Sequence, residues 1–194
     1  MSAQVNNLLD MARLESRAVH LRREWQPVDE VLGSALAHCQ VSLGSRRVRV
    51  HLGEDLPLLH LDAALMERVF INLLENASKY TPSNAQLQLR AQLTPSTVRL
   101  VLDDDGPGLP LGREEAVFEK FERGSKEAAV AGVGLGLAIC RAIMQAHGGS
   151  ITGENRLEGG QIRGARFVLT LPRGEPPQGD GSGAPIHEGS EHSV

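Results

Sequence analysis

The chain has 194 residues, of which 41% are hydrophobic, and a formal net charge of −4 at pH 7. This length and composition suit one main globular domain with a single sizeable core. The acidic balance provides no basic surface that would indicate a nucleic acid as the main partner.

No apolar run approaches the roughly 18 residues that a transmembrane helix needs, and the N-terminus lacks the basic-then-apolar layout of a signal peptide. We therefore expect a cytoplasmic fragment without membrane contact. Cys39 and Cys140 lie far apart inside apolar helical patterns. This placement is typical of reduced core residues, and a disulfide or a shared metal is the alternative.

The residue patterns in the first part of the chain predict two helices and two strands. Apolar residues at helical spacing over residues 5–14 indicate an opening amphipathic helix, either the end of a longer helix or a short native one. Residues 21–25 suit a short strand, and Pro27 then opens a helix. Alternation over residues 47–52 predicts a half-buried strand. The buried stripe of the Pro27 helix is expected at Val28, Val31, Leu32, Ala35 and Leu36.

The stretch 71–80 is an amphipathic helix with an unusual polar face, and Asp62 can cap the helix that carries it. Its polar residues recur at spacings of four, three and one, along one stripe: Asn72, Asn76, Lys79 and Tyr80. An amide oxygen can hold Mg²⁺ without neutralising it, and a lysine one turn further on can meet phosphates. A half-buried helix with solvated polar residues is the alternative.

Strands are predicted over residues 86–93 and 97–103, joined as a hairpin, after a break at residues 81–84. They lead directly into Asp103-Asp104-Asp105-Gly106-Pro107-Gly108. Glycines let the backbone approach a planar ligand, and a carboxylate at a strand end can accept the exocyclic amine of adenine. A plain turn is the alternative.

A second glycine-rich run, Gly132-Val133-Gly134-Leu135-Gly136, stands immediately before a helix predicted over residues 138–147. The free N–H groups and positive dipole end of a helix N-terminus suit a phosphate. The run is neither a Walker loop nor a dinucleotide fingerprint, because it lacks a following Gly-Lys-Ser/Thr and follows no strand. A flexible hinge is the alternative.

The helix over residues 138–147 is expected to turn Ile139, Ala142, Ile143 and Ala146 to the core and to stop at Gly148-Gly149. Residues 151–155 and 165–171 are predicted as the last strands, with residues 157–164 between them. From Arg173 onward, Gly, Pro, Ser and acidic residues dominate. That composition predicts a disordered tail.

Together, in this order, these motifs resemble the ATP-binding catalytic domain of sensor histidine kinases, within the group that includes gyrase, the ninety-kilodalton heat-shock chaperone and mismatch-repair ATPases. The likeness spans about residues 5–172 and is greatest to the potassium-responsive Kdp sensor kinases. It implies a two-layer α/β sandwich whose mixed sheet is covered on one face by three helices. Four segments resemble the N box, first glycine box, F box and second glycine box: residues 72–80, 104–108, 118–121 and 132–136.

The resemblance also implies ligands, ATP and Mg²⁺, and roles for single residues. Asn76 would bind Mg²⁺ with help from Asn72, Lys79 and Arg123 would contact phosphates, Tyr80 would pack near the adenine, and Asp104 would accept its amine. The segment between Phe121 and Gly132 would be a lid over the nucleotide. The implied ATP-binding residues are Asn72, Asn76, Lys79, Tyr80, Asp104, Gly106, Gly108, Phe118, Arg123, Gly132, Val133, Gly134, Leu135 and Gly136.

One residue discriminates among the branches of this group. Asn72 stands where ATP-hydrolysing members and serine-phosphorylating anti-sigma kinases place a Glu, and an amide cannot act as a base. A neutral imidazole nucleophile needs no such base. This favours a histidine kinase that passes the γ-phosphoryl to a histidine on a dimerisation domain and then to a response regulator. Glu75 as a substitute base, an anti-sigma-type serine kinase, and a nucleotide-binding module without transfer activity remain alternatives.

None of the seven histidines has the His-Glu/Asp-x-Arg-x-Pro surroundings of the family's phosphoacceptor. We therefore expect the catalytic part of a kinase without its acceptor, and no autophosphorylation by the isolated chain. The expected organisation is the end of a dimerisation helix in residues 1–20, the ATP-binding catalytic domain in residues 21–173 and a disordered tail in residues 174–194. Full-length members of the family are anchored in the bacterial inner membrane.

Overall fold

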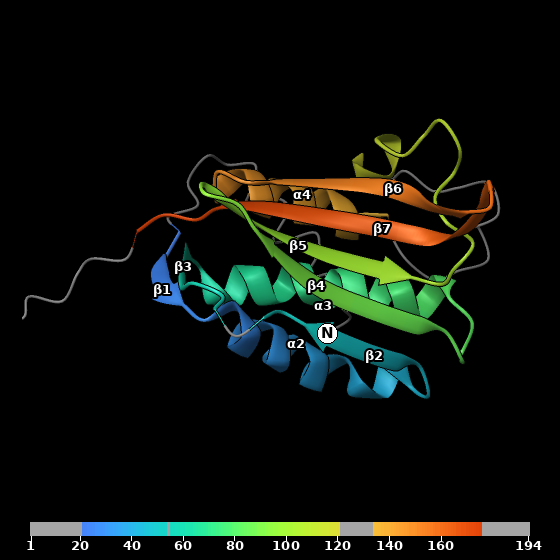
Figure 1. The fold of residues 1–194 in the computed structure, drawn as a ribbon, viewed down its shortest axis with the longest axis horizontal. Coiled ribbons are helices and arrows are strands. Elements are labelled where there is room, and N and C mark those ends of the chain that lie inside the picture. Colours follow the sequence, from blue (N-terminus) through green and yellow to red (C-terminus); the bar gives the residue numbers. More distant parts are fainter. Residues whose placement is uncertain (1–20, 54, 121–133, 176–194) are drawn as a thin grey trace, which may run out of the picture.

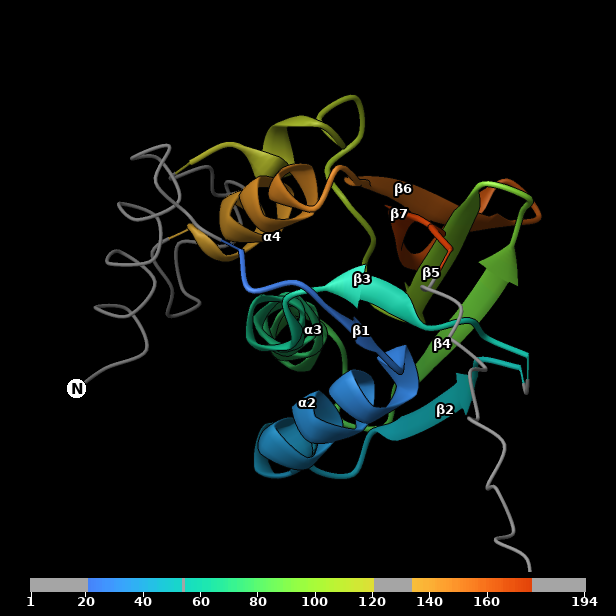
Figure 2. The ribbon, with the colours of Figure 1, turned by 90° about the vertical axis from the view of Figure 1, so that its left-hand side faces the viewer.

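The computed structural model describes residues 21–53, 55–120 and 134–175, and Figure 1 shows their fold. Its centre is a five-stranded sheet in the order β2-β4-β5-β7-β6. The strands are β2 (Arg47–His51), β4 (Gln86–Leu93), β5 (Thr97–Asp104), β6 (Ser150–Glu158) and β7 (Gln161–Pro172). In Figure 2, the helices α2 (Val28–Leu43), α3 (Ala63–Tyr80) and α4 (Gly136–Ala146) lie together on one face of this sheet. The predicted two-layer sandwich with three helices is confirmed.

The sheet is mixed, because β2 runs parallel to β4 while the other neighbours are antiparallel. β5 is the central strand, so the aspartates at its end lie in the middle of the sheet. The prediction of a half-buried strand at residues 47–52 is wrong in part. β2 is an edge strand, and Val50 is exposed while Val48 is partly buried.

A separate two-stranded sheet pairs β1 (Glu24–Gln26) with β3 (Leu59–Leu61) in antiparallel register. The rings of Trp25 and His60 stack across it with centroids 5.1 Å apart. The strand predicted over residues 21–25 begins three residues later, at Glu24, and ends one residue later, at Gln26. The strand β3 was not predicted. Only the pairing of two segments distant in sequence makes either of them a strand.

Helix α3 is held at both ends as the sequence predicts. The Asp62 carboxylate accepts a hydrogen bond from the backbone N–H of Leu65 at 3.2 Å, which caps the first turn. At the other end the Thr81 hydroxyl donates to the carbonyl of Ala77 at 2.7 Å, and Pro82 follows. The apolar face of α3 is buried at Met66, Val69, Phe70, Leu73, Leu74 and Ala77.

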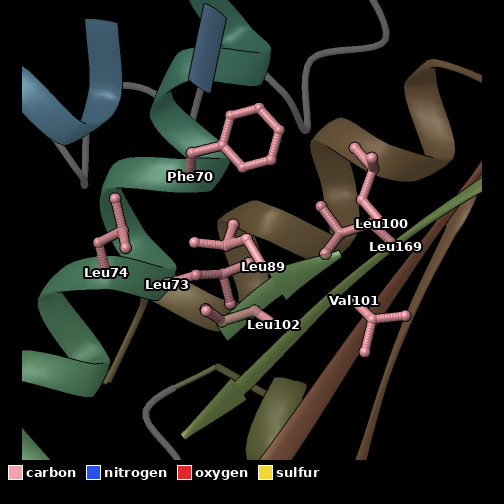
Figure 3. Close-up of a pocket in the computed structure, with 8 residues that line it drawn as sticks. All are labelled: Phe70, Leu73, Leu74, Leu89, Leu100, Val101, Leu102 and Leu169. Atoms are coloured by element: carbon pink, nitrogen blue, oxygen red, sulfur yellow. The ribbon is translucent and has the colours of Figure 1, made fainter. Parts of the chain in front are cut away.

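The core lies between α3 and the sheet. Figure 3 shows a small pocket there, and its lining consists of hydrocarbon side chains. Leu73 of α3 faces Leu89 of β4 and Leu102 of β5 across it. Because no polar group reaches this gap, it is a packing defect of the core and offers nothing to a nucleotide.

The two cysteines are free thiols buried in this core, as predicted. The Cys140 thiol donates to the carbonyl of Val69 at 3.7 Å. Burial raises the pKa of Cys140 to about 12 and also raises the pKa of Cys39. Both are therefore inert packing residues at neutral pH.

Helix α4 ends as predicted at Gly148, where a positive φ of 72° permits the turn and the Gly149 N–H bonds the Met144 carbonyl at 2.9 Å. The predicted core face is partly wrong. Ala142 and Ala146 are half-buried, whereas Cys140 and Met144 are buried. α4 packs on α3 and also on the hairpin of β6 and β7, so its buried surface is wider than one stripe.

The last hairpin is longer than the strands predicted over residues 151–155 and 165–171. Gln161 and Ile162 belong to β7 and pair with Glu158 and Leu157 of β6. A register shift between Arg156 and Leu157 marks a β-bulge, which absorbs the irregular pairing opposite Gly164. Residues predicted as a loop thus extend the sheet beside the end of β5.

Candidate functional site

Asn72 is the most enclosed polar residue of the α3 stripe, with 7% of its surface exposed. Its amide oxygen lies 3.6 Å from where a Cβ would stand on Gly136, the first residue of α4. Within the described ranges its Nδ2 has no hydrogen-bond partner. Burial raises the pKa of the Cys140 thiol on α4, and the Asn72 side chain nevertheless contacts this thiol closely enough to act against that rise, so Nδ2 points into the core and the amide oxygen lies beside the start of α4.

The rest of the stripe is progressively more exposed. Asn76 is half-buried, while Lys79 and Tyr80 are exposed at the end of α3. The Lys79 ammonium lies 3.3 Å from the Glu75 carboxylate, four residues earlier. Both side chains are about one-third exposed, so this pair is weak and leaves Lys79 able to turn toward another anion.

Glu75 lies about 60° around α3 from Asn72, on the flank toward α2. Burial raises the pKa of Cys39 on α2, and the negative charge of Glu75 raises it further, which places the carboxylate near that helix. Asn72 instead adjoins Gly136 on α4. The two side chains therefore face different helices, which argues against Glu75 as a substitute for a base at position 72.

Asp104, the last residue of β5, is buried and held in one orientation. Its Oδ1 accepts hydrogen bonds from the backbone N–H groups of Gly106 at 2.7 Å and Ala165 at 3.1 Å. Both hydrogen bonds from the described chain use Oδ1, so Oδ2 is available to an external donor. A fixed carboxylate with one unused oxygen suits the amine of a base.

Burial raises the pKa of Asp104 and outweighs the opposing effects of its two backbone hydrogen bonds and of the Arg156 charge. Asp105 next to it raises the pKa further. Holding this carboxylate ionised in a buried position thus opposes stability. A buried carboxylate with a perturbed pKa is typical of a functional position.

The first glycine box lies tightly against its surroundings. A Cβ on Gly106 would stand 2.8 Å from Asp104 Oδ1 and 3.5 Å from the carbonyl of Tyr80, at the end of α3. A Cβ on Gly108, where φ is 80°, would stand 2.3 Å from Asn155 Oδ1. Close approach therefore favours glycine at position 106, and both close approach and backbone conformation require it at position 108.

Phe118 of the F box is an anchor. It ends the short 3₁₀ helix η1 (Ala116–Phe118) and is 2% exposed. Its ring packs edge-on against Phe167, with centroids 6.3 Å apart, and the Arg141 guanidinium lies 4.5 Å from its centroid. Phe118 therefore fixes the segment that precedes the predicted lid to α4 and the sheet. Its contact with a nucleotide remains a prediction.

Of the second glycine box the structure describes three residues. Gly134 has a φ of 72°, Leu135 is buried, and Gly136 opens α4 beside Asn72. Arg123, Gly132, Val133 and the predicted lid lie outside the described residues, as do the predicted first helix and residues 176–194 of the predicted tail.

Sequence reasoning missed two residues on β6. The Asn155 amide accepts from the backbone N–H of Leu109 at 2.6 Å and donates to the Leu109 carbonyl at 3.0 Å. Arg156 donates to the carbonyl of Asp104 at 2.7 Å. Nothing local marks these residues, because their role depends on β6 crossing behind the glycine loop.

A charged cluster on the open face of the sheet lies behind Asp104. Burial would raise the pKa of Asp103, but the hydrogen bonds and charge of Arg166, with the charges of Arg90 and Arg156, outweigh it and lower the pKa. The Arg166 Nε lies 2.6 Å and the Arg90 Nη2 2.5 Å from the Asp103 carboxylate. Asp103 is thus a structural acid facing away from the helices.

The α3 stripe connects the two halves of the site. Its first residue, Asn72, adjoins the start of α4, and its last residue, Tyr80, adjoins Gly106. Eight residues of helix rise about 12 Å. A carboxylate acceptor at one end and amides beside a helix N-terminus at the other fit an elongated ligand with a base and a phosphate chain.

A family model described as "Histidine kinase-, DNA gyrase B-, and HSP90-like ATPase" matches residues 61–175, which contain all of these features. The chain belongs to this ATPase family. Over 174 residues it is 51% identical to the sensor protein KdpD of Escherichia coli (strain K12), covering 90% of this chain and 19% of that protein.

Two further members extend the comparison. The signal transduction histidine-protein kinase/phosphatase MprB of Mycolicibacterium paratuberculosis is 36% identical over 186 residues, which cover 92% of this chain and 34% of that protein. A solved structure of full-length ShkA in complex with AMPPNP matches with a TM-score of 0.75 and 25% identity, over 88% of this chain and 35% of that one. The chain thus spans a minor part of the relatives that it matches.

The described residues include neither a membrane span nor a cluster of metal ligands. None of their helices is long and apolar enough to cross a membrane. No group of three or more His, Cys, Asp or Glu side chains among them could hold a metal ion.

Proposed function

We propose that this chain is the Mg·ATP-binding catalytic domain of a two-component sensor histidine kinase. It would donate the γ-phosphoryl group to a histidine on a dimerisation domain, for relay to a response regulator. The observation that carries the proposal is the α3 stripe, which runs from the buried Asn72 beside Gly136 to Tyr80 beside Gly106. The family match and the kinase relatives support it.

At the base end, Asp104 would accept the adenine amine on Oδ2 while its Oδ1 is held by Gly106 and Ala165. Guanine presents an O6 acceptor at the corresponding position, so a carboxylate there would face a second acceptor. Tyr80 at the end of α3 would pack near the base. Gly106 lies against the Asp104 carboxylate and the end of α3, where a side chain at position 106 would be in contact with both.

At the phosphate end, Asn76 and Asn72 would hold Mg²⁺ through amide oxygens. Mg²⁺ bound there would supply positive charge that stabilises the phosphates during phosphoryl transfer. Lys79 would leave its weak pair with Glu75 to meet a phosphate. Arg123 and residues 132–136 complete the proposed phosphate contacts.

Because position 72 carries no general base, a histidine is the favoured acceptor of the phosphoryl group. An amide cannot remove a proton from water or from a serine hydroxyl, whereas a neutral imidazole attacks through its own lone pair. Glu75 pairs with Lys79 and lies toward α2. An anti-sigma-type serine kinase and a nucleotide-binding module are therefore disfavoured alternatives.

The partners follow from the proposed reaction. A dimerisation domain with the phosphoacceptor histidine would bind in cis in a longer kinase, and a response regulator would take the phosphoryl group from it. The domain would work in the cytoplasm, where ATP is available, with no nucleic acid or membrane contact of its own. The likeness to the ShkA structure, which holds AMPPNP, supports a nucleotide as the ligand.

Incubation with γ-labelled ATP tests the proposal. The purified chain should bind Mg·ATP and retain no phosphate. Its rate of ATP hydrolysis should be roughly 10²–10⁴-fold lower than that of a site with a general base. A separate dimerisation domain with its histidine box should become labelled, weakly, because the lost tether removes a high effective concentration.

Acid treatment of the labelled proteins separates the alternatives. Phosphohistidine is lost in acid, and phosphoserine survives. Acid-labile label on the added domain supports the histidine kinase. Acid-stable label on this chain alone would overturn it in favour of the serine kinase, and ATP binding without any transfer would leave a nucleotide-binding module.

A further inference from the structure

Arg156 is the side chain that connects all three aspartates of the Asp103-Asp104-Asp105 run. Its Nη1 donates to the Asp104 carbonyl at 2.7 Å and lies 2.9 Å from Asp105 Oδ1. Its Nε lies 3.9 Å from Asp103 Oδ2. One guanidinium thus bridges the end of β5 and the start of the glycine loop.

The backbone around Arg156 is built for this contact. Its pairing partner on β7 is Gly164, and the register shift that follows it turns the strand at this point. A Cβ on Gly164 would stand 1.7 Å from the carbonyl oxygen of Asp104. Only glycine opposite Arg156 therefore leaves the Asp104 carbonyl in reach of the guanidinium.

The contact bears on the orientation and charge of the Asp104 carboxylate. The Asp104 backbone is held by Arg156, and its side chain is held by Gly106 and Ala165. The Arg156 charge opposes the rise that burial and Asp105 impose on the Asp104 pKa. The same guanidinium pairs with Asp105, and this pairing offsets part of the repulsion between the Asp105 and Asp104 carboxylates.

We infer that Arg156 is a positioning residue for adenine selection, which acts through Asp104 by fixing its backbone and pairing its acidic neighbour. The inference rests on the proposed ATP-binding function and goes beyond it, because Arg156 lies outside every motif of the site. In this role it touches no ligand. It keeps Oδ2 of Asp104 aimed and ionised for the amine of an adenine nucleotide.

A purely structural role for Arg156 makes a different prediction, and Arg90 provides the matched control. Arg90 is also on the open face, is 34% exposed against 30% for Arg156, and pairs with Asp103 at 2.5 Å. It contacts neither Asp104 nor Asp105 in the described structure. If the cluster only stabilises the sheet, removing either arginine should have the same effect.

The experiment measures ATP and GTP affinities by calorimetry, with Mg²⁺ present, for Arg156→Gln, Arg156→Lys and Arg90→Gln. Thermal unfolding without nucleotide confirms that each variant is folded at the assay temperature. Arg156→Gln should weaken ATP binding about tenfold and leave GTP binding nearly unchanged, so the preference for ATP narrows. Arg156→Lys, which keeps the charge but not the fork, should recover part of the preference. Arg90→Gln should keep the wild-type preference within about twofold.

An unchanged ATP preference in folded Arg156→Gln would overturn the inference, and so would equal losses in Arg156→Gln and Arg90→Gln. These failures differ from failure of the proposed function. In that case the wild-type chain would bind neither nucleotide, and no variant would be informative about adenine.

Discussion

His147 and Asp62 join the end of α4 to the start of α3. The imidazole Nε2 accepts a hydrogen bond from the backbone N–H of Asp62 at 2.9 Å, and Nδ1 bonds the Ile143 carbonyl at 2.8 Å. These partners assign the neutral tautomer with its proton on Nδ1. The residue that caps α3 is therefore held by the last turn of the helix that follows the second glycine box.

This contact should make stability depend on pH. Burial lowers the pKa of His147 below 6.5, with help from the charge of Arg23, although the hydrogen bond to Ile143 and the charge of Asp62 act in the other direction. The stability from the neutral ring is fully present above the unfolded pKa and is lost as pH falls through the folded pKa. Urea unfolding of the wild type should show this loss below about pH 6.5.

The matched variant is His147→Gln, whose amide can accept from Asp62 but does not titrate. Its free energy of unfolding should fall less than that of the wild type between pH 7 and pH 5. Parallel pH profiles for the two proteins would assign the acid sensitivity to other groups.

Asp104→Asn should separate binding from folding. The amide can still accept from Gly106 and Ala165, but it presents a donor where adenine needs an acceptor. We expect ATP affinity to fall at least tenfold, about 1.4 kcal/mol, measured by calorimetry. Equal affinities of the wild type for ATP and GTP would remove Asp104 from the site.

The same variant should be more stable without nucleotide at pH 7. Burial raises the pKa of Asp104, so its contribution to stability is present below the unfolded pKa of 3.8 and is lost as pH rises through the folded pKa. Asparagine does not ionise, so the variant does not lose this stability as pH rises. Thermal unfolding should show a higher midpoint for Asp104→Asn at pH 7 and a smaller difference near pH 3, whereas a lower midpoint at pH 7 would contradict the sign.

Asn76 variants test the metal assignment. Asn76→Ala removes an oxygen ligand, and Asn76→Asp adds a charge beside the phosphates and alters the metal geometry. Both should weaken ATP binding in Mg²⁺ more than in EDTA, by about tenfold for the alanine variant. Asn84→Ala, at an exposed asparagine after α3, is the control. Wild-type Mg²⁺ dependence in both Asn76 variants would make it a surface residue only.

Two glycine substitutions should have opposite effects on folding. Gly164→Ala would drive a methyl group onto the Asp104 carbonyl oxygen, and we expect a loss of about 3 kcal/mol or more. Gly33→Ala, inside α2 with no atom within 4 Å of the new methyl, should stabilise by about 0.5–1 kcal/mol. Urea unfolding measures both, and a neutral Gly164→Ala would mean that β7 can move away from β5.

The local signals of the sequence predicted much of the fold. The α3 cap at Asp62, the β4–β5 hairpin and the stop at Gly148 are confirmed, because each depends on neighbouring residues. The β1–β3 pair and the extension of β7 to Gln161 depend on partners distant in sequence, which no local pattern reveals. The predicted domain limits stay a prediction.

The site shows the same division. The motifs located Asn72, Asp104 and the glycines, since their residue types and spacing carry the chemistry. Their roles toward ATP and Mg²⁺ stay predictions. The sequence did not reveal Asn155 and Arg156, because only the pairing register of β6 brings these residues to the glycine loop.

The small sheet of β1 and β3 has a consequence for how the domain is attached. Gly174, just past β7, lies so close to Trp25 of β1 that a Cβ would stand 2.9 Å from the indole ring. The incoming and outgoing strands of the folded unit therefore meet at one corner (Figure 1). A segment attached at either end would leave the folded unit at this corner, and a movement transmitted there would carry the adenine and phosphate ends of the proposed site together.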